Sequence, residues 1–522
     1  MSVTNRLSVF LQALSVRSAC LLAVLLGALN VLAFAPFFIW PMQIVSLALM
    51  FSLLSLRSDW TKKQFALLGF CFGFGLMFAG VSWLLIAMIR YGGMPVIAAA
   101  FALTVFTAYL ALFPAAVLAA GRYLQQRWHS NDAVLLLLIL PSFWGISEFL
   151  RGTLLTGFPW LSFGYAHQIS PLSGFAPVLG VYGLGGLAAV MAGAMALLVL
   201  RRDWRRRVWF GLIALMLAGL TLRQLAWTTP HGNPISVRLV QTNIDQGEKF
   251  DEAFFHRILQ QVETAITVQP ADLIAIPETA IPVTAAYLPP EYLPRLQSFA
   301  QQTSSHLFVG MVTEDEQARY SNSIVGMSPE PVLSGSKSYH YDKHHLVPFG
   351  EFVPWGFRWL VDMMHIPLGD QVRMGLLQNP MQVKDQKVMP NICYEDLFGD
   401  EIALQLRTQV QQQGEAAHIL LNVSNLAWYG DSIAIPQHLQ ISQMRAMETG
   451  RPMLRSTNTG ATAIIDERGQ VQTKLATLSL ASLSGSVQGM TGLTPYVRFG
   501  DAIAAVLAAI ALFAAWLIRR RA

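Results

Sequence analysis

Apolar residues are concentrated in two parts of the chain. Long apolar runs fill residues 18–228 and a shorter run fills 500–518, whereas the stretch between them, roughly 229–495, has the mixed pattern of a soluble domain. A helix needs about 20 apolar residues to cross a bilayer. The pattern predicts eight spans, at residues 18–36, 40–56, 65–89, 94–120, 133–150, 174–200, 207–225 and 500–518. We therefore expect a polytopic α-helical membrane domain that carries one large soluble domain.

Strand and helix patterns alternate between residues 229 and 495. Period-two or continuous apolar runs predict strands at 235–244, 271–279, 305–315, 321–329, 387–393, 417–425, 451–469 and 471–477. Helical spacing appears at 252–268, 398–414 and 436–450. This alternation favours a layered α/β domain, and 267 residues are enough for one sizeable core. The predicted divisions are 1–228 with seven transmembrane helices, the catalytic domain 229–495, and 496–522 with helix eight and a basic tail.

The basic residues predict the orientation of the spans. Charged residues make up only 13% of the chain. Short cytoplasmic loops carry the Lys and Arg of a membrane protein. One set of alternate loops and tails carries fifteen of them, and the opposite loops carry two, Arg90 and Arg151. The fifteen are Arg6, Arg17, Arg57, Lys62, Lys63, Arg122, Arg127, Arg201, Arg202, Arg205, Arg206, Arg207, Arg519, Arg520 and Arg521. Both termini are therefore predicted to be cytoplasmic, with the 229–495 domain on the far side.

The first apolar run has an alternative interpretation as a cleaved signal peptide. Its "AFA" at 33–35 resembles a signal-peptidase site. The run is longer than a usual signal-peptide core, and Pro36 would follow the cut, so we favour an uncleaved helix. The large domain lies outside the cytoplasm under either interpretation.

Cys393 is the one cysteine of the soluble domain; Cys20 and Cys71 lie in apolar runs. Exported compartments are usually oxidising, but a single cysteine cannot form a disulfide within its domain. Cys393 is thus an inert buried residue or a thiol used in chemistry. It lies where a predicted strand ends and a helix soon begins, where backbone N–H groups and the helix dipole stabilise a thiolate. The hypothesis that Cys393 is a nucleophile is the one that neighbouring motifs can support or exclude.

A nucleophilic cysteine needs a base and a group that stabilises the oxyanion. His344 and His345 leave a Cys–His pair open, although we interpret the adjacent histidines as structural rather than metal-binding. Two other segments place a charged residue in apolar or aromatic surroundings. "IAIPETAIP" places Glu278 just past a buried strand, where apolar surroundings make a carboxylate a better base. "YHYDKHHLVPFGEFVP" places Lys343 among aromatic residues, with Glu351 eight residues later.

The motifs "PETAIP", "YDKHHLVPFGEFVP" and "ICYED" resemble the Glu–Lys–Cys triad motifs of the nitrilase superfamily. More specifically, they resemble its membrane branch, the bacterial apolipoprotein N-acyltransferases. The resemblance covers nearly the whole chain, including "EFLRGTLLTGFPWLSFGYAH" (148–167) and "RPMLRSTNTG" (451–460). It implies an α-β-β-α sandwich on a transmembrane bundle. It also implies that Glu278 is the general base, Lys343 the oxyanion stabiliser and Cys393 the nucleophile, supported by Glu351 and Glu395.

The resemblance implies a ping-pong acyl transfer. Cys393 would take an acyl chain from a membrane phospholipid, typically phosphatidylethanolamine, and the α-amino group of a diacylglyceryl-cysteine on a lipoprotein would accept it from the thioester. No metal, organic cofactor or nucleic-acid partner is expected. The expected location is the bacterial inner membrane, with the catalytic domain in the periplasm.

The aromatic run 353–369 is a candidate lid that dips into lipid, since Trp-rich and Met-rich loops suit membrane interfaces. Candidate lid or substrate contacts are Trp355, Trp359, Met363, Tyr394 and Trp428. Near the outer end of span five, Glu148 and Arg151 are ionisable residues at a membrane boundary and so are functional candidates. Their spacing of three residues favours the alternative, a local ion pair.

Two other function classes remain open. A membrane-tethered amidase or nitrilase that hydrolyses small nitrogen compounds would use the same triad, with water in place of the amine. A soluble substrate needs neither eight spans nor an apolar loop, which argues against it. A non-catalytic sensor or scaffold would not need an intact triad. A long-chain acyl group on Cys393 would separate the three.

Overall fold

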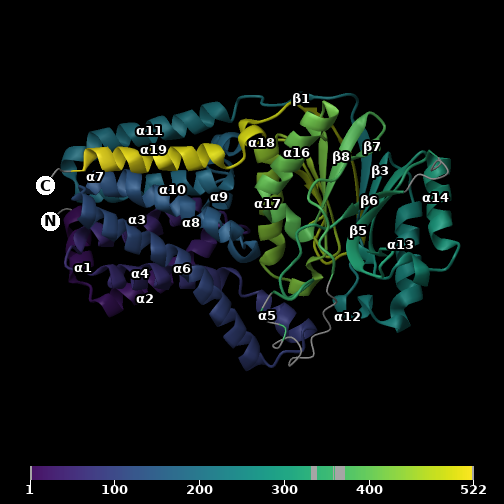
Figure 1. The fold of residues 1–522 in the computed structure, drawn as a ribbon, viewed down its shortest axis with the longest axis horizontal. Helices are drawn as coiled ribbons and strands as arrows, with labels where there is room; N and C mark the ends of the chain where they lie inside the picture. Colours follow the sequence, from purple (N-terminus) through teal and green to yellow (C-terminus); the bar gives the residue numbers. More distant parts are fainter. Residues whose placement is uncertain (1–2, 331–337, 355, 357, 359–370, 520–522) are drawn as a thin grey trace. The chain divides into compact units, whose positions relative to one another are not determined.

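The computed structural model describes residues 3–330, 338–354, 356, 358 and 371–519. Its contacts divide the chain into two compact units (Figure 1). The helical unit comprises Met1–Leu85, Val96–Ala226 and Phe499–Ala522. The sandwich unit comprises Ile86–Pro95 and Trp227–Arg498. A ten-residue insert from the first part of the chain thus belongs to the second unit, which the apolar pattern did not indicate.

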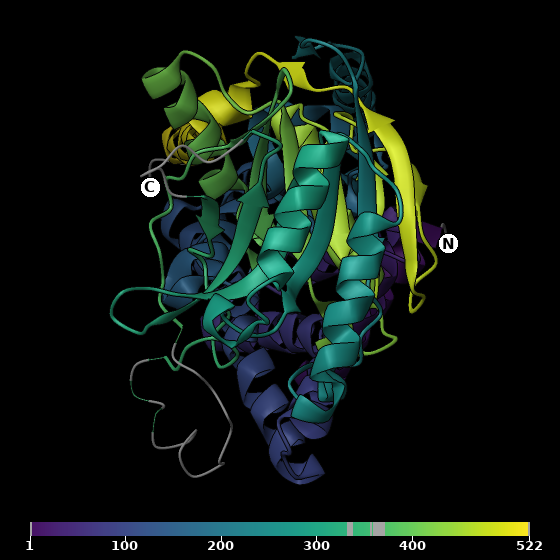
Figure 2. The ribbon, with the colours of Figure 1, turned by 90° about the vertical axis from the view of Figure 1, so that its right-hand side faces the viewer.

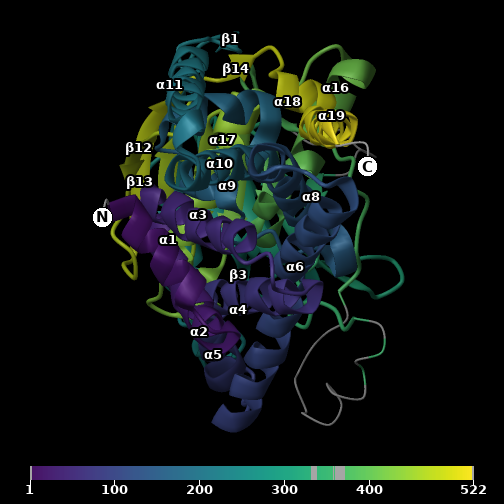
Figure 3. The same cartoon turned by 90° about the vertical axis from the view of Figure 1, so that its left-hand side faces the viewer.

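The helical unit is built mainly from long helices (Figure 3), and most of these are apolar. Its elements are α1 (Val3–Ala13), α2 (Val16–Leu29) with η1 (Asn30–Ala33), α3 (Trp40–Leu56), α4 (Lys62–Gly80), α6 (Val96–Trp128), α7 (Asp132–Val134), η3 (Leu135–Ile139), α8 (Leu140–Thr153), η4 (Leu154–Thr156), α9 (Phe163–Ala166), η5 (Pro171–Phe175), α10 (Ala176–Leu200), η6 (Arg202–Trp204), α11 (Arg205–Leu222) and α19 (Ala502–Ile518). Among the described residues, five helical segments are long and apolar enough to cross a membrane, and Trp40–Leu56 and Ala502–Ile518 are shorter apolar helices. α11 matches predicted span seven, and it begins with three arginines.

The third predicted span, 65–89, is not one continuous helix. α4 ends at Gly80, where the indole N–H of Trp83 donates to the Gly80 carbonyl at 3.1 Å. The short helices α5 (Leu84–Ile86) and η2 (Ala87–Tyr91) follow it. Apolar residues continue through this turn, so hydropathy alone could not locate the end of the helix.

Helices α2, α4 and α6 approach one another closely through glycines. A Cβ on Gly27 would lie 2.0 Å from the Phe72 carbonyl oxygen of α4. A Cβ on Gly69 would lie 2.4 Å from the Pro114 carbonyl oxygen of α6. Small residues allow this backbone contact where no hydrophobic effect drives helices together in lipid.

Glu148 and Arg151 form the expected local ion pair, with 4.0 Å between Arg151 Nη2 and Glu148 Oε1. Both side chains are buried within the helical unit. Arg151 also donates to the Trp160 carbonyl at 2.8 Å, and Glu148 accepts from the Phe163 N–H at 2.7 Å. The pair therefore fastens the loop after α8 to the helix.

Within the described residues, the sandwich unit contains two six-stranded sheets. The first has the order β13-β2-β3-β4-β5-β6, and the second has the order β12-β11-β10-β9-β8-β7. The strands of the first are β2 (Ile235–Gln241), β3 (Leu273–Ile281), β4 (His306–Glu314), β5 (Tyr320–Met327), β6 (Tyr339–Asp342) and β13 (Ala481–Val487). The strands of the second are β7 (Met381–Val383), β8 (Gln386–Ile392), β9 (Ile419–Ser424), β10 (Met453–Thr457), β11 (Ala463–Ile465) and β12 (Val471–Lys474). A separate pair joins β1 (Thr229–Pro230) and β14 (Met490–Thr491), and α18 (Pro495–Phe499) follows.

Helices cover the outer faces of both sheets. α13 (Phe255–Thr267) and α14 (Tyr292–Thr303) lie over the first sheet (Figure 2). α16 (Gly399–Gln413) and α17 (Ala434–Thr449) pack on the second. One face of α13, made by Ile258, Leu259, Val262 and Ile266, is buried, as its helical spacing requires. The expected α-β-β-α sandwich is therefore present.

Most predicted elements of the sandwich unit are present within a few residues of their expected bounds. β13 was missed because its sequence, "ASLSGSV", is mostly small and polar, although it pairs along its length with β2. α14, β6 and β7 were also missed. Pro390 does not interrupt β8, because β7 pairs only with 386–388 and ends before the proline.

Candidate active site

The sequence predicted that Glu278 lies just past the end of a strand. It lies instead in a bulge within β3. Ile276 pairs with Val309 of β4 and Ile281 pairs with Met311, so residues 277–280 of β3 face only Gly310. A Cβ on Gly310 would lie 2.1 Å from the Pro277 carbonyl oxygen, which explains the glycine. Thr279 has φ 44°, a left-handed conformation that is costly for a β-branched residue. The backbone at Glu278 therefore departs from the regular pairing of β3 with β4.

Lys343 follows β6 directly and its side chain is 1% exposed. Its Nζ lies 3.1 Å from Glu278 Oε1 and 2.7 Å from Glu351 Oε1. Burial alone would lower the pKa of Lys343, but the two carboxylates raise it well above its ordinary value. The ammonium is therefore charged throughout the physiological range.

Cys393 is the first residue after β8 and the first residue of η9 (Cys393–Leu397), with φ 52°. Its carbonyl lies 3.3 Å from Nε2 of His438. Nη2 of Arg455 lies 2.8 Å from Nδ1 of the same ring. Since arginine can only donate, Nδ1 accepts and the neutral ring donates from Nε2 to Cys393. Hydrogen bonds from buried side chains thus hold the strained backbone at Cys393.

The resting Cys393 thiol is protonated, which corrects the expectation of a stabilised thiolate. Burial and the negative charge of Glu278 raise its pKa well above the ordinary range, and Lys343 and the Asn425 N–H lower it only in part. η9 is too short to offset this desolvation. A reaction at this thiol would need a base to remove its proton, and Glu278 is the carboxylate whose charge acts most strongly on the thiol.

Asn322 and Asn425 are buried residues that donate hydrogen bonds to Glu278, and the sequence did not point to either of them. Nδ2 of Asn322 donates to Glu278 Oε1 at 2.7 Å and to Glu351 Oε1 at 3.1 Å. The backbone N–H of Asn425 donates to Glu278 Oε2 at 2.8 Å. The available signal was weak: a polar Ser-Asn-Ser triplet within the otherwise apolar strand β5. Both oxygens of Glu278 are thereby fixed in place.

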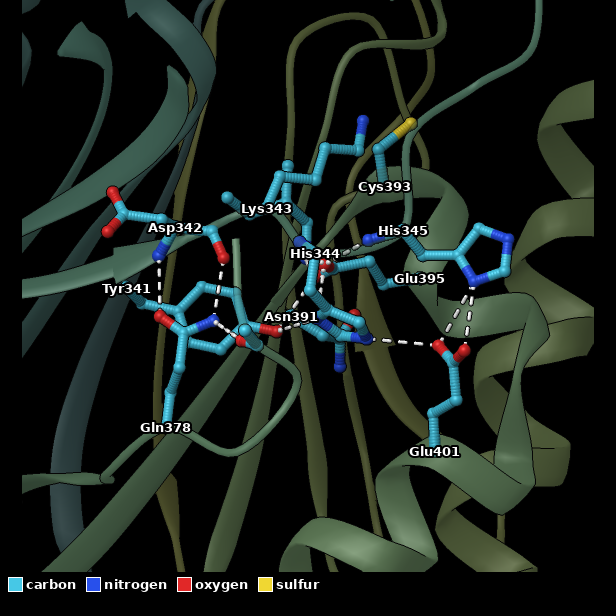
Figure 4. A network of polar contacts seen from close by, with 12 residues as sticks. Tyr341, Asp342, Lys343, His344, His345, Gln378, Asn391, Cys393, Glu395 and Glu401 are labelled. Atoms are coloured by element: carbon cyan, nitrogen blue, oxygen red, sulfur yellow. Dashed lines mark hydrogen bonds and ion pairs between the residues drawn. The ribbon is translucent and has the colours of Figure 1, made fainter. Parts of the chain in front are cut away.

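Glu395 joins the backbone before Cys393 to the backbone after Lys343 (Figure 4). Its Oε1 accepts from the His344 N–H at 2.7 Å, and its Oε2 accepts from the Ile392 N–H at 2.7 Å and the Tyr341 hydroxyl at 2.8 Å. Figure 4 shows the Lys343 ammonium and the Cys393 sulfur directed to the same side, away from the histidines. Glu395 is therefore placed to set the relative position of these two backbone segments.

His344 and His345 pair with the carboxylates of Glu395 and Glu401. Nε2 of His344 lies 3.0 Å from Glu401 Oε2, and Nδ1 of His345 lies 3.0 Å from Glu401 Oε1 (Figure 4). Burial lowers the pKa of His344, but Glu395 and Glu401 raise it to about 9. These contacts agree with a structural role and place neither ring beside the thiol as a base.

The described residues include one group of metal-ligating type, His231, Glu415 and His418. The backbone N–H of Lys387 donates to Nδ1 of His418 at 3.1 Å, so the neutral ring carries its proton on Nε2. That nitrogen faces Glu415 at 2.9 Å and has no free lone pair for a metal. The arrangement fits a cluster of side chains paired with Glu415 rather than a ligand set.

Of the remaining candidate lid or substrate contacts, the structure describes Tyr394 and Trp428. Tyr394 is buried, with its ring against His345 and Phe398. Trp428, on η10 (Leu426–Tyr429), is 39% exposed and meets the ring of Tyr91 edge-on at 5.5 Å. Trp355, Trp359 and Met363, and with them most of the candidate lid 353–369, lie outside the described residues.

Comparison with known proteins gives two family matches that together cover most of the chain. The apolipoprotein N-acyltransferase N-terminal domain matches residues 26–194, and the carbon-nitrogen hydrolase family matches residues 236–496. Among solved structures, Saccharomyces cerevisiae Nit3, a nitrilase-superfamily member, is 16% identical, with a TM-score of 0.37 over 49% of this chain and 91% of that chain.

Several curated relatives match nearly the full length. The apolipoprotein N-acyltransferase of Ralstonia nicotianae is 46% identical, over 97% of this chain and 94% of the relative. That of Nitrosomonas europaea is 43% identical over 94% and 95%, and that of Vibrio vulnificus is 35% identical over 96% and 97%. The resemblance inferred from the motifs is confirmed: the chain belongs to the apolipoprotein N-acyltransferase family, the membrane-embedded acyltransferases of the nitrilase superfamily.

Proposed function

We propose that this protein transfers a fatty acyl chain from a membrane phospholipid to the α-amino group of diacylglyceryl-cysteine at a lipoprotein N-terminus. The observation that carries the proposal is the buried contact between Glu278 and Lys343 beside a protonated Cys393, in a chain of this family. The Glu278, Lys343 and Cys393 triad supplies a base, a fixed positive charge and a nucleophile. Glu351 and Glu395 are assigned supporting roles.

In the first half-reaction, Glu278 takes the thiol proton while Sγ of Cys393 attacks the carbonyl carbon of the phospholipid ester. The Lys343 ammonium stabilises the negative charge that develops on the carbonyl oxygen. The carbon–oxygen bond to the glycerol then breaks, and Glu278 returns its proton to the departing oxygen. A lysophospholipid leaves, and the acyl chain remains as a thioester on Cys393.

In the second half-reaction, the neutral α-amino group of the lipoprotein attacks the thioester carbonyl. Glu278 accepts a proton from this nitrogen as the carbon–nitrogen bond forms, and the thiolate of Cys393 leaves and is reprotonated. The product is an amide and the enzyme returns to its starting state. The acyl group stays near ester energy until the amine arrives, so no nucleotide is consumed.

Phosphatidylethanolamine is the proposed donor, because the family resemblance implies it. We further propose that both termini are cytoplasmic and that residues 229–495 form the periplasmic catalytic domain, between the helices of 1–228 and the helix and basic tail of 496–522. The distribution of basic residues supports this orientation. Two lipid-anchored substrates also account for a catalytic domain tethered to a bilayer.

The direct test is transfer in nanodiscs that contain phosphatidylethanolamine and a synthetic diacylglyceryl-cysteine peptide. The proposal expects an N-acylated peptide and one lysophospholipid per transfer, and no product with Cys393→Ala. Release of free fatty acid without N-acylation would instead support a hydrolase. Absence of both products with folded protein would contradict an enzymatic role.

A further inference from the structure

A second buried lysine lies beside the base and has no role in the mechanism above. Lys249 ends the short helix α12 (Gln246–Lys249), and its side chain is buried at 2% exposure. Its Nζ donates to the backbone carbonyl of Glu278 at 3.0 Å and to Oγ1 of Thr279 at 2.7 Å. Both acceptors are neutral, so among the described residues this ammonium has no carboxylate in direct contact.

Burying an ammonium without a bonded counter-ion is costly, and such lysines are rare without a purpose. Burial lowers the pKa of Lys249 to about 8, even though Glu278 and Cys393 both raise it. On its own helix, Asp245 faces Arg90 and Glu248 faces Arg257. The charges that act on Lys249 therefore come from the active site rather than from a local ion pair.

The contacts of Lys249 fall on the most strained part of the base-bearing strand. Glu278 and Thr279 lie in the bulge opposite Gly310, and Thr279 has φ 44°. The Lys249 ammonium bridges the Glu278 carbonyl and the Thr279 hydroxyl. Gln246, on the same helix, accepts from Nδ2 of Asn425 at 2.6 Å, and the N–H of Asn425 bonds the other side of Glu278. α12 thus supports the base from two directions.

The charge of the site also depends on Lys249. Without it, the buried contact group has two carboxylates, Glu278 and Glu351, and one ammonium, Lys343. With the thiol protonated, that group has a net charge of −1, and its carboxylates and ammonium are all buried. Moving the thiol proton to Glu278 relocates this charge to sulfur but does not remove it. A second ammonium makes the site neutral before and after the proton transfer, which lowers the cost of forming the thiolate.

We propose that the Lys249 ammonium is a positioning residue that holds the backbone of the base Glu278 and supplies the second positive charge needed to load Cys393. This inference rests on the proposed function for its acyl-transfer readout. The thiolate that Lys249 favours is also measurable without any lipid, so the two proposals can fail separately.

The experiment measures loading from phosphatidylethanolamine nanodiscs, without an amine acceptor, between pH 6 and 9.5. In the parent, loading should slow as pH rises through about 8, where Lys249 loses its charge. Lys249→Met, which preserves volume, should load about 100-fold more slowly at pH 7 and should lack this alkaline decline. Lys384→Met, the same change at an exposed lysine, should follow the parent curve.

A second variant, Thr279→Val, keeps Lys249, so its result is informative even if Lys249→Met does not fold. Thr279→Val has the shape of threonine but removes one acceptor from the charged form of Lys249. The pKa of Lys249 should then fall, and the alkaline decline should move to lower pH. An unchanged pH profile in Thr279→Val would overturn the proposal. So would a Lys249→Met variant that loads at the parent rate, or one slowed equally at every pH with the decline still present.

The lipid-free readout is alkylation of Cys393 by a small maleimide in a background with Cys20→Ala and Cys71→Ala. Lys249→Met should slow alkylation at pH 7, because less thiolate forms, while Lys384→Met should not. If the parent never loads from phospholipid but Lys249→Met still slows alkylation, the acyl-transfer proposal fails and the role of Lys249 stands. Equal alkylation rates in the parent and Lys249→Met would refute that role.

Discussion

The amide Nδ2 of Asn322 lies 2.7 Å from Oε1 of Glu278. The same nitrogen lies 3.1 Å from Oε1 of Glu351, so one neutral donor separates the two carboxylates that share Lys343. An amide bridge at this point gives both buried carboxylates a neutral hydrogen-bond donor. Asn322 therefore belongs to the arrangement as much as the charged residues do.

Replacing Asn322 with leucine should impair catalysis more than folding. The change keeps side-chain volume but leaves two buried carboxylates with one donor fewer each, which should slow Cys393 loading by about 100-fold. Loading from phosphatidylethanolamine in nanodiscs measures this. Asn379→Leu, at an exposed asparagine, is the matched control. Parent-like loading by Asn322→Leu would show that the bridge is dispensable.

Gly310→Ala should disrupt the bulge that carries Glu278. The added Cβ would lie 2.1 Å from the Pro277 carbonyl oxygen, so either β3 or β4 must move. We expect a destabilisation of about 1–3 kcal/mol and a larger loss of loading activity, because Glu278 moves with the bulge. Thermal unfolding and loading are measured together. Gly375→Ala, which has nothing within 4 Å of its added Cβ, should change neither; an equally mild effect from both variants would contradict this account of the bulge.

The His344–Glu401 contact should make stability depend on pH in a defined direction. The folded pKa of His344 is raised to about 9, so its stabilisation is complete below its unfolded value of about 6.5 and is lost as pH rises through about 9. A shift of this size corresponds to about 3 kcal/mol, shared between Glu395 and Glu401.

Glu401→Gln should consequently lower the melting temperature at pH 6 and approach the parent at pH 9.5. The measurement is thermal unfolding of the detergent-solubilised protein at both pH values. Glu316→Gln, at an exposed glutamate, serves as the control and should match the parent at both. A Glu401→Gln deficit that is equal at pH 6 and pH 9.5 would show that His344 is not charged in the folded protein.

Sequence patterns predicted the layers of the sandwich unit because its buried strands and amphipathic helices bury their faces in the usual way, as in β8, β9 and α17. They failed where backbone geometry, rather than residue type, decides the outcome. The end of α4 at Gly80 lies within an unbroken apolar run, and β13 pairs through its backbone with small polar side chains.

The candidate triad was predictable from local motifs, but the groups that hold it were not. Lys249, Asn322 and Asn425 come from three separate segments and are ordinary polar residues in sequence. Only the packed fold brings them onto Glu278. The thiolate expected at Cys393 was wrong for a related reason: desolvation depends on the whole fold, and the local strand-to-helix pattern cannot reveal it.

The proposed orientation predicts opposite behaviour for two reporter fusions. A periplasm-dependent reporter fused after residue 228 should be active, and one inserted at residue 203, among the arginines between α10 and α11, should be inactive. A cytoplasm-dependent reporter should give the reverse pattern. Cytoplasmic activity of the fusion after 228 would contradict the assignment of residues 229–495 to the periplasm.

The central claim is that Cys393 carries the acyl chain as a thioester between the two half-reactions. Intact mass spectrometry of protein purified from phospholipid membranes without acceptor tests it most directly. The account predicts one added long-chain acyl group, located on Cys393, sensitive to hydroxylamine and absent from Cys393→Ala and Glu278→Gln, while Cys20→Ala and Cys71→Ala retain it. Active protein that never carries this group, or Cys393→Ala that still N-acylates the peptide, would contradict the mechanism.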